Sequence, residues 1–434
     1  MIGHNGQPGG FGFIPKPPGR ARPRRASAAT ATNSNMTRFL PAVFRDPTIR
    51  VSMLALFMFG VASAATSPYQ SVVGIRELGL SNGLYSALIF SAAAVNVTVS
   101  ILLGNLADRL GEYRAMMLAA ALFGVLGYGA IYILPHQATF VVSALLLLPV
   151  YGSLNSLLFG NVRRRTTGMP RDDVARVNSG VRAMMSLSWV LVPGLTGVLL
   201  ARSPSMLPAY LFAGIACAAC FSLIAIFLPR QTGTDKAASR HLSYLAALGE
   251  VVSPPVLVRV IAIALISSTL HVNGAILPLI VTGAAHGTVA DLGILIGIVA
   301  FLEVVFIIVW GRAQRIMSHV TALAIGASIY VVYLTLLGFA SAPWHVYALT
   351  LISGIGAAAL ISIPITYLQD LIAERPGLGS ALISVNIFIS AGLSALLFAI
   401  GTAVSSYSGT AFIGALAGVI GLAMLLYFDR LRRR

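Results

Sequence analysis

Residues 104–114 read GNLADRLGEYR and separate two apolar runs, at 84–106 and 115–134. Each run has about 20 residues, which as an α-helix is long enough to cross the hydrocarbon core of a bilayer, about 30 Å thick. A short polar stretch between two such runs is typical of a loop at a membrane surface. Its glycines let helix ends approach closely, and Asp108, Arg109 and Arg114 offer ion pairs that can form and break.

Apolar runs of this length recur almost to the end of the chain. They lie at 51–73, 84–106, 115–134, 138–160, 178–201, 207–228, 258–282, 291–311, 319–340, 345–367, 378–402 and 407–428. Apolar residues make up 57% of the 434 residues and charged residues 10%, and the mean hydropathy is +0.87. Because the backbone in lipid must satisfy its own hydrogen bonds, we expect an all-α membrane protein with twelve transmembrane helices. This composition excludes soluble enzymes and outer-membrane barrels.

The charge is distributed unevenly between the two sides of the predicted membrane protein. The net charge is +16, and nearly all of the 29 basic residues lie on segments that share the side of residues 1–48. Arg76 and Arg202 fall on the other side, and Arg182 lies within an apolar run. The positive-inside rule then places both termini in the cytoplasm. The bias explains the charge without a nucleic-acid partner.

The polar segments divide the chain into two halves. Residues 1–48 are rich in Gly, Pro, Arg, Ser and Ala and are expected to be a disordered cytoplasmic tail without a signal peptide; Met36 is an alternative start to Met1. The longest internal polar segment, 229–257, is expected to link a bundle of six helices at 49–228 to a second at 258–428, which a basic tail at 429–434 follows. Two six-helix halves are typical of a transporter built from repeats. A weak echo between PGLTG at 193–197 and AGLSA at 391–395 favours the repeat.

No residue pattern indicates a cofactor, a metal site or an enzyme. Cys217 and Cys220 both lie in an apolar run, where small packing residues are the better interpretation. The sequence has no GxxxxGK[ST] phosphate loop for ATP, and no paired acids, histidine cluster or nucleophile constellation within the apolar runs. We therefore expect neither catalytic residues nor a cofactor, and a monomer that works in the lipid bilayer.

The spacing G-x-L-A-D-R-x-G-x-x-R resembles the signature loop of the major facilitator superfamily. This resemblance implies two pseudo-symmetric six-helix bundles that expose a central site to each side of the membrane in turn. It also implies a gating role for the residues that match the motif, which are Gly104, Asp108, Arg109, Gly111 and Arg114. The equivalent stretch of the second half, GRAQR at 311–315, lacks the acid.

Short segments elsewhere are similar to the bacterial sugar efflux transporter (SET) family. They are RELG at 76–79, VRA at 181–183, SLSWV at 186–190 with Pro193, LE at 302–303 and QDL at 369–371. The resemblance implies proton-coupled efflux of sugars or glycosides across the inner (plasma) membrane of a bacterium. The alternative is a proton-coupled exporter of drugs or other metabolites from the same superfamily, for which we expect a cavity with fewer amides.

Two charged residues lie inside the apolar runs and away from the run ends, where an ionised side chain costs several kcal/mol. Arg182 and Glu303 have similar depths from the side of the N-terminal tail, roughly 8 and 11 Å at 1.5 Å per residue. The resemblance places their two helices face to face across the seam between the halves. We therefore predict an Arg182–Glu303 ion pair that couples proton movement to transport. The alternative is that Arg182 snorkels to the headgroups while Glu303 is held neutral by a local hydrogen bond.

Sugar recognition needs amides that match hydroxyl groups and an aromatic face. The neutral candidates near the middle of the runs are Gln70, Asn96, Ser186, Trp189, His271, Asn273 and Asn386. Together with Arg182 and Glu303 they form the predicted substrate site. Trp189 and His271 also fit ordinary packing roles. Asn273-Gly274 is expected to mark a local break in its helix, as transporters use near their sites.

Overall fold

The computed structural model describes residues 46–203, 205–229, 254–371 and 376–433. Within these ranges, twelve helices are long and apolar enough to cross a membrane, which confirms the predicted number and the all-α class. Most of the predicted tail 1–48 and linker 229–257 lie outside the described residues. Helix is already present from Pro254 and continues to Arg433, so the helices that flank the linker and end the chain are longer than the apolar runs suggested.

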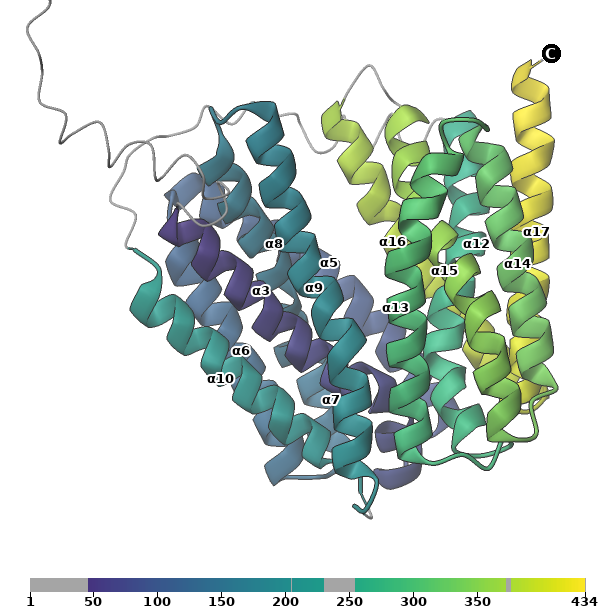
Figure 1. Ribbon diagram of the computed structural model, residues 1–434. Helices are drawn as coiled ribbons and strands as arrows, with labels where there is room; N and C mark the ends of the chain where they lie inside the picture. The colour runs from purple at the N-terminus through teal and green to yellow at the C-terminus, as the bar shows by residue number, and fades with distance from the viewer. Residues whose placement is uncertain (1–45, 204, 230–253, 372–375, 434) are drawn as a thin grey trace, which may run out of the picture. The chain divides into compact units, whose positions relative to one another are not determined.

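The helices follow one another in an up-and-down order (Figure 1). Those of the first half are α3 (Pro47–Thr66), α4 (Gln70–Val72), α5 (Asn82–Leu110), α6 (Tyr113–Ile133), α7 (Gln137–Val142), α8 (Leu148–Thr166), α9 (Arg171–Leu200) and α10 (Pro208–Phe227). Those of the second half are α12 (Pro254–Val281), α13 (Val289–Ala313), α14 (His319–Gly338), α15 (Pro343–Leu371), α16 (Pro376–Val404) and α17 (Tyr407–Arg433). We call the end at which α3 begins and α8 finishes the basic end, because Arg163, Arg164 and Arg165 lie there, and the other the opposite end.

The first and fourth crossing segments are irregular. A 3-10 turn, η1 (Ser67–Tyr69), and a π-helical turn, η2 (Val73–Glu77), flank α4, and another π-helical turn, η3 (Ser143–Leu147), joins α7 to α8. Pro68 has no N–H to continue the hydrogen bonding of α3, which accounts for a break at η1. π-Helical turns within α-helices are frequently found at functional sites.

The two halves meet along two helix pairs, α9 with α13 and α5 with α16. Small residues permit the first crossing near the opposite end: a Cβ atom on Gly293 would lie 2.2 Å from the carbonyl oxygen of Pro193, and one on Gly197 would lie 3.1 Å from the Cα of Gly293. In the second crossing, Ser86 donates to the carbonyl oxygen of Ala395. The echo segments 193–197 and 391–395 therefore both lie where the halves touch.

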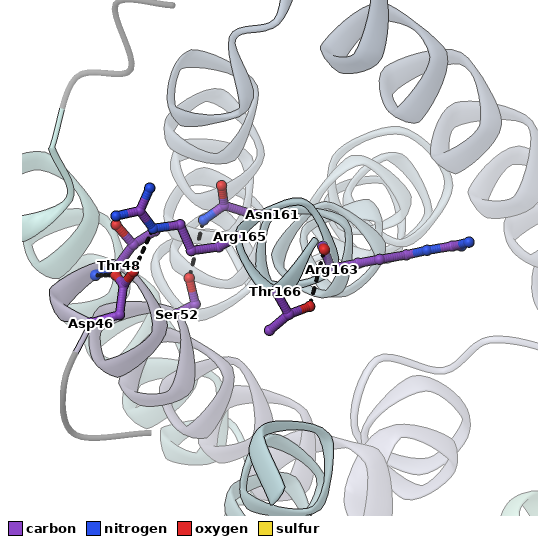
Figure 2. A network of polar contacts seen from close by, with 7 residues as sticks. All are labelled: Asp46, Thr48, Ser52, Asn161, Arg163, Arg165 and Thr166. Atoms are coloured by element: carbon purple, nitrogen blue, oxygen red, sulfur yellow. Dashed lines mark hydrogen bonds and ion pairs between the residues drawn. The ribbon is translucent and has the colours of Figure 1, made fainter. Parts of the chain in front are cut away.

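A polar network at the basic end holds α8 against the start of α3 (Figure 2). Asp46 caps α3 by accepting from the backbone N–H of Thr48 (2.8 Å), and its other carboxylate oxygen pairs with Arg165. Partial burial raises the pKa of Asp46, but the hydrogen bonds from Arg165 and Thr48 outweigh it and hold this pKa below its ordinary value. Deeper in the same interface, Asn161 donates to the hydroxyl of Ser52 (3.2 Å).

Candidate functional site

A cavity of about 480 Å³, which we call the central cavity, lies between the halves. Its walls come from the η1 turn and α9 of the first half and from α12, α13, α14 and α15 of the second. Most of the lining side chains are apolar, among them Met185, Leu270, Leu277, Ile296 and Ile307. A mostly apolar cavity with a few polar groups is the usual form of a small-molecule site.

Four of the predicted site residues meet in the central cavity, namely Ser186, Trp189, Asn273 and Glu303. Ser186 and Trp189 lie three residues apart, so α9 presents both on one face. The orientation of Asn273 is fixed because its side-chain oxygen accepts a hydrogen bond from the Tyr333 hydroxyl (3.0 Å). The cavity thus combines an indole ring, one amide and one carboxyl group, and each half supplies part of the set.

Glu303 supplies the acidic side chain of this cavity. No ion pair or hydrogen bond to its carboxylate is formed by the described residues. The neighbouring Val304 and Ile307 also line the cavity, so the carboxyl group is surrounded largely by apolar side chains. An unpaired carboxylate in such surroundings is costly, and taking up a proton removes the part of that cost that comes from the charge.

The predicted partner of Glu303 lies elsewhere in this structure. The side chain of Arg182 is exposed, does not line the central cavity and forms no ion pair with Glu303. It is four residues before Ser186, hence on the same face of α9 and about 6 Å nearer the basic end. The Arg182–Glu303 pair stays a prediction, now for a state in which the basic ends of α9 and α13 come closer together.

Gln70 and Asn96 line a second cavity, of about 290 Å³, which we call the side cavity. It lies within the first half, between the η1 turn, α5, α6, α8 and α10, and Ser67 lines both cavities. Asn96 donates to the carbonyl oxygen of Pro149 (3.0 Å). The sequence alone grouped these two amides with Trp189 and Glu303, whereas the structure divides the polar residues between two cavities.

The remaining predicted substrate residues, His271 and Asn386, line neither cavity. The exposed His271 donates from Nδ1 to the carbonyl oxygen of Ser267 (3.1 Å) on its own helix, and Asn386 is buried within α16. The expected helix break at Asn273-Gly274 was wrong, because α12 is continuous from Pro254 to Val281. Neither residue requires a break, because glycine and asparagine merely lower helix propensity.

The predicted gating loop is anchored within the first half. Gly111 ends α5 with a left-handed backbone (φ 67°), and its carbonyl oxygen accepts from Arg164 of α8 (2.9 Å). Arg114 donates to the carbonyl oxygen of Ala225 (2.6 Å) in the last turn of α10, where a cation is favoured. Arg109 is exposed, and a Cβ atom on Gly104 would meet no atom within 4 Å. The side chain of Asp108 lies outside the described residues, so its gating role stays a prediction.

The RELG segment connects the halves at the opposite end, a role that the sequence alone did not suggest. Arg76 donates to both the carbonyl oxygen (3.1 Å) and the hydroxyl (2.6 Å) of Thr282, and to the carbonyl oxygen of Leu279 (2.9 Å), at the end of α12. Glu77 instead stays within its own half and accepts from the Ser205 hydroxyl (2.6 Å) and the Met206 N–H (2.7 Å). The sequence did contain a signal for Arg76, because it is one of the few basic residues on that side of the membrane.

Several lining residues were missed because they resemble ordinary helix-packing residues. Tyr330 and Ser353 line the central cavity, and Tyr128 and Tyr210 line the side cavity. The signal for this region was Pro68, because a proline inside a membrane segment marks irregular backbone. Among the described residues no group of three or more His, Cys, Asp or Glu side chains is arranged to hold a metal ion.

Comparison with known proteins identifies a consistent set of relatives. Residues 10–169 match the family model of the Major Facilitator Superfamily. The chain is 25% identical over 381 residues to a putative sugar efflux transporter of Deinococcus radiodurans, covering 87% of this chain and 97% of that protein. It is 24% identical over 393 residues to sugar efflux transporter C of Escherichia coli, covering 90% and 97% of the two chains.

Solved structures agree on the fold. The nucleoside transporter NupG superposes with a TM-score of 0.75 at 12% identity, covering 88% of this chain and 99% of that one. A peptide transporter POT, solved in complex with sulfate, superposes with a TM-score of 0.71 at 14% identity, covering 89% and 95%. At these identities the likeness extends to the fold, and the predicted arrangement of twelve helices in two related bundles is confirmed.

Proposed function

We propose that this chain is a transporter of the major facilitator superfamily and that it exports sugars or glycosides in exchange for protons. Sugar efflux transporters are among its relatives. Substrate binds in the central cavity, which is exposed to the two sides of the membrane in turn. The protein works as a monomer in a bacterial inner membrane with both termini in the cytoplasm. The relatives are transporters, and we propose no catalytic reaction.

One observation supports this proposal above the others: Glu303 and Trp189 line the same cavity from opposite halves. An indole ring can stack on the apolar face of a sugar ring, while Ser186 and Asn273 offer hydroxyl and amide groups to the sugar hydroxyls. The carboxyl group of Glu303 can take up and release a proton beside the bound substrate. When the halves rock, α9 and α13 move against each other. The protonation of Glu303 and the closing of the site therefore both change the contact between these two helices.

The packing between the halves supports a direction for the open side. Close contacts between the two halves lie toward the opposite end of the described structure, where Gly197 packs against Gly293 and Arg76 donates to Thr282. Arg182, nearer the basic end on the same helix, is exposed. With the basic end in the cytoplasm, this arrangement corresponds to a site accessible from the cytoplasm, from which an exporter takes its substrate.

The alternative, export of apolar drugs or other metabolites, is favoured by one feature. Among the described residues, Asn273 supplies the one side-chain amide that lines the central cavity, whose walls are otherwise mostly apolar. A substrate with a large apolar part would fit those walls. The two classes differ in whether hydroxyl groups are required for binding, and the experiment can separate them.

The test is substrate-dependent proton movement in inside-out membrane vesicles that contain the full chain. Addition of lactose should release a lumenal proton load, as read by a pH-sensitive dye, and vesicles without the protein serve as the control. If lipophilic drugs cause proton movement and lactose does not compete with them, the substrate belongs to the alternative class and not to the sugars. Absence of proton movement with every substrate that is transported would refute the coupling.

A further inference from the structure

Several residues that line the side cavity carry polar groups that form no hydrogen bond with the described residues. Among the described residues, no hydrogen bond is made by the side chain of Gln70, and the side-chain oxygen of Asn96 accepts none. Tyr210 is 1% exposed, and its hydroxyl has no hydrogen-bond partner in the described structure. A buried hydroxyl without a partner costs about 1–3 kcal/mol, so such a group calls for an explanation.

The three residues line a common space from different helices. Gln70 follows the η1 turn, Asn96 lies in the middle of α5, and Tyr210 lies in the first turn of α10. Two amides and a phenol offer both donors and acceptors, which suits hydroxyl groups because each hydroxyl also donates and accepts. The ring of Phe140 adds an apolar wall, with its centroid 6.3 Å from that of Tyr210.

The two cavities differ in chemistry but are adjacent. The central cavity has mostly aliphatic walls with Trp189 and the amide of Asn273, whereas the side cavity has the two amides of Gln70 and Asn96, and Ser67 lines both. The 3-10 turn that contains Ser67 and Pro68 separates them, so a ligand that extends past this turn would contact both sets of residues. The polar part of a ligand would be stabilised in the side cavity and its apolar part in the central cavity.

We propose that the side cavity is a separate subsite for the hydroxyl groups of a single hexopyranose ring, with Gln70, Asn96 and Tyr210 as its polar contacts. The proposal rests on the proposed transport of sugars or glycosides and assigns the sugar ring to the first half. Trp189, Ser186 and Asn273 in the central cavity then contact whatever is attached to that ring, which in lactose is the second sugar ring.

Two substitutions test the subsite without breaking an existing contact. Gln70→Leu removes an amide that makes no hydrogen bond to the described residues, and Tyr210→Phe removes a hydroxyl that has no partner among them. The matched control is Asn155→Leu, because the side-chain oxygen of Asn155 is also buried without a partner but lines neither cavity. Equal thermal stability of the purified variants shows that each one is folded.

The measurement is equilibrium binding of methyl and phenyl β-D-galactopyranoside to the full chain in lipid nanodiscs. These two probes share the sugar ring and differ in the attached group. Each subsite variant should weaken binding of both probes by about the same factor, roughly 2- to 10-fold for one neutral hydrogen bond. Trp189→Ala should weaken the phenyl compound more than the methyl compound, and Asn155→Leu should change neither.

The outcomes separate the subsite from the transport proposal. If the unmodified protein binds these galactosides and both subsite variants bind them as tightly, the side cavity is not the sugar subsite, although sugar transport stands. If Gln70→Leu weakens the phenyl compound alone, the ring is not held there either. If the unmodified protein binds neither probe nor the corresponding glucosides, the sugar assignment itself fails, and the subsite fails with it.

Discussion

Replacing Arg76 with alanine should loosen the closed opposite end of the protein. The substitution removes three hydrogen bonds that a single guanidinium group makes to the last turn and the end of α12: two to Thr282 and one to Leu279. These bonds join the two halves, so they exist only while the opposite end is closed. Arg76→Lys is the matched variant, because it keeps a cation near the helix end but not the planar fork of donors.

The size of the effect follows from the exposure of this contact. A hydrogen bond to a charged group contributes about 1.5–3 kcal/mol when it is well shielded. Arg76 is exposed, so water replaces part of each lost bond, and exposed charged contacts contribute less. We take about 1–2 kcal/mol for the whole group, which corresponds to a shift of roughly 5- to 30-fold in the ratio of closed to open opposite ends. The lysine variant should retain about 0.3–1 kcal/mol of this through the helix end.

The assay is a distance measurement by double electron–electron resonance with one spin-label pair at each end. Gly83 and Val404 are exposed positions on different halves at the opposite end, and Asn178 and Gln369 serve for the basic end. The native Cys217 and Cys220 are fully buried, which limits background labelling. Arg76→Ala should add a longer distance at the opposite end and shorten the one at the basic end. Unchanged distributions at both ends would refute the role of Arg76 as a contact that holds the halves together.

Three further predictions concern stability and binding. Asp46→Asn keeps the cap on α3 but loses the ion pair with Arg165, so it should cost about 0.5–1 kcal/mol at neutral pH. Because the pKa of Asp46 is lowered in the folded state, this stabilisation is present above the unfolded pKa of about 3.9 and is lost as the pH falls through the folded pKa. The melting temperatures of the variant and the parent should therefore converge at low pH. Gly293→Ala should lower the melting temperature and separate α9 from α13, because the added Cβ atom overpacks this crossing at a cost of about 1–3 kcal/mol. Gly274→Ala is the control and should do neither, because a Cβ atom there meets nothing within 4 Å. Trp189→Phe should retain part of the affinity for lactose, whose second ring would lie against Trp189, and Trp189→Ala should lose most of it in a binding titration; equal lactose affinities in all three proteins would make Trp189 a packing residue.

The architecture could be predicted from the sequence because lipid imposes a simple rule on it. Apolar runs of sufficient length must be helical, so twelve runs gave twelve helices, and only their ends moved. The loop at 104–114 and the short SET-like segments indicated the family for the same reason that motifs usually do: they fix several residue types at fixed spacing. Ser186 and Trp189 were both predicted as substrate residues from their depth, and both line the central cavity.

The arrangement of the site could not be predicted as fully, because helical position gives depth and not the direction of a side chain across the bundle. Gln70 and Asn96 have the depth of site residues but line the side cavity, on the far side of the η1 turn from Glu303. Arg182 and Glu303 have matching depths, but the pairing also depends on which ends of α9 and α13 are in contact. Asn386 has the right depth and is buried within α16.

The most direct test of the account is transport by the Glu303→Gln protein. Glutamine keeps the size and the polar character of the side chain in the central cavity but cannot release a proton. The variant should still exchange labelled lactose down its gradient in vesicles, at equal protein abundance, yet should fail to concentrate it when a pH gradient is imposed. A Glu303→Gln protein that concentrates lactose against its gradient as well as the parent does would show that this carboxyl group does not couple protons to transport.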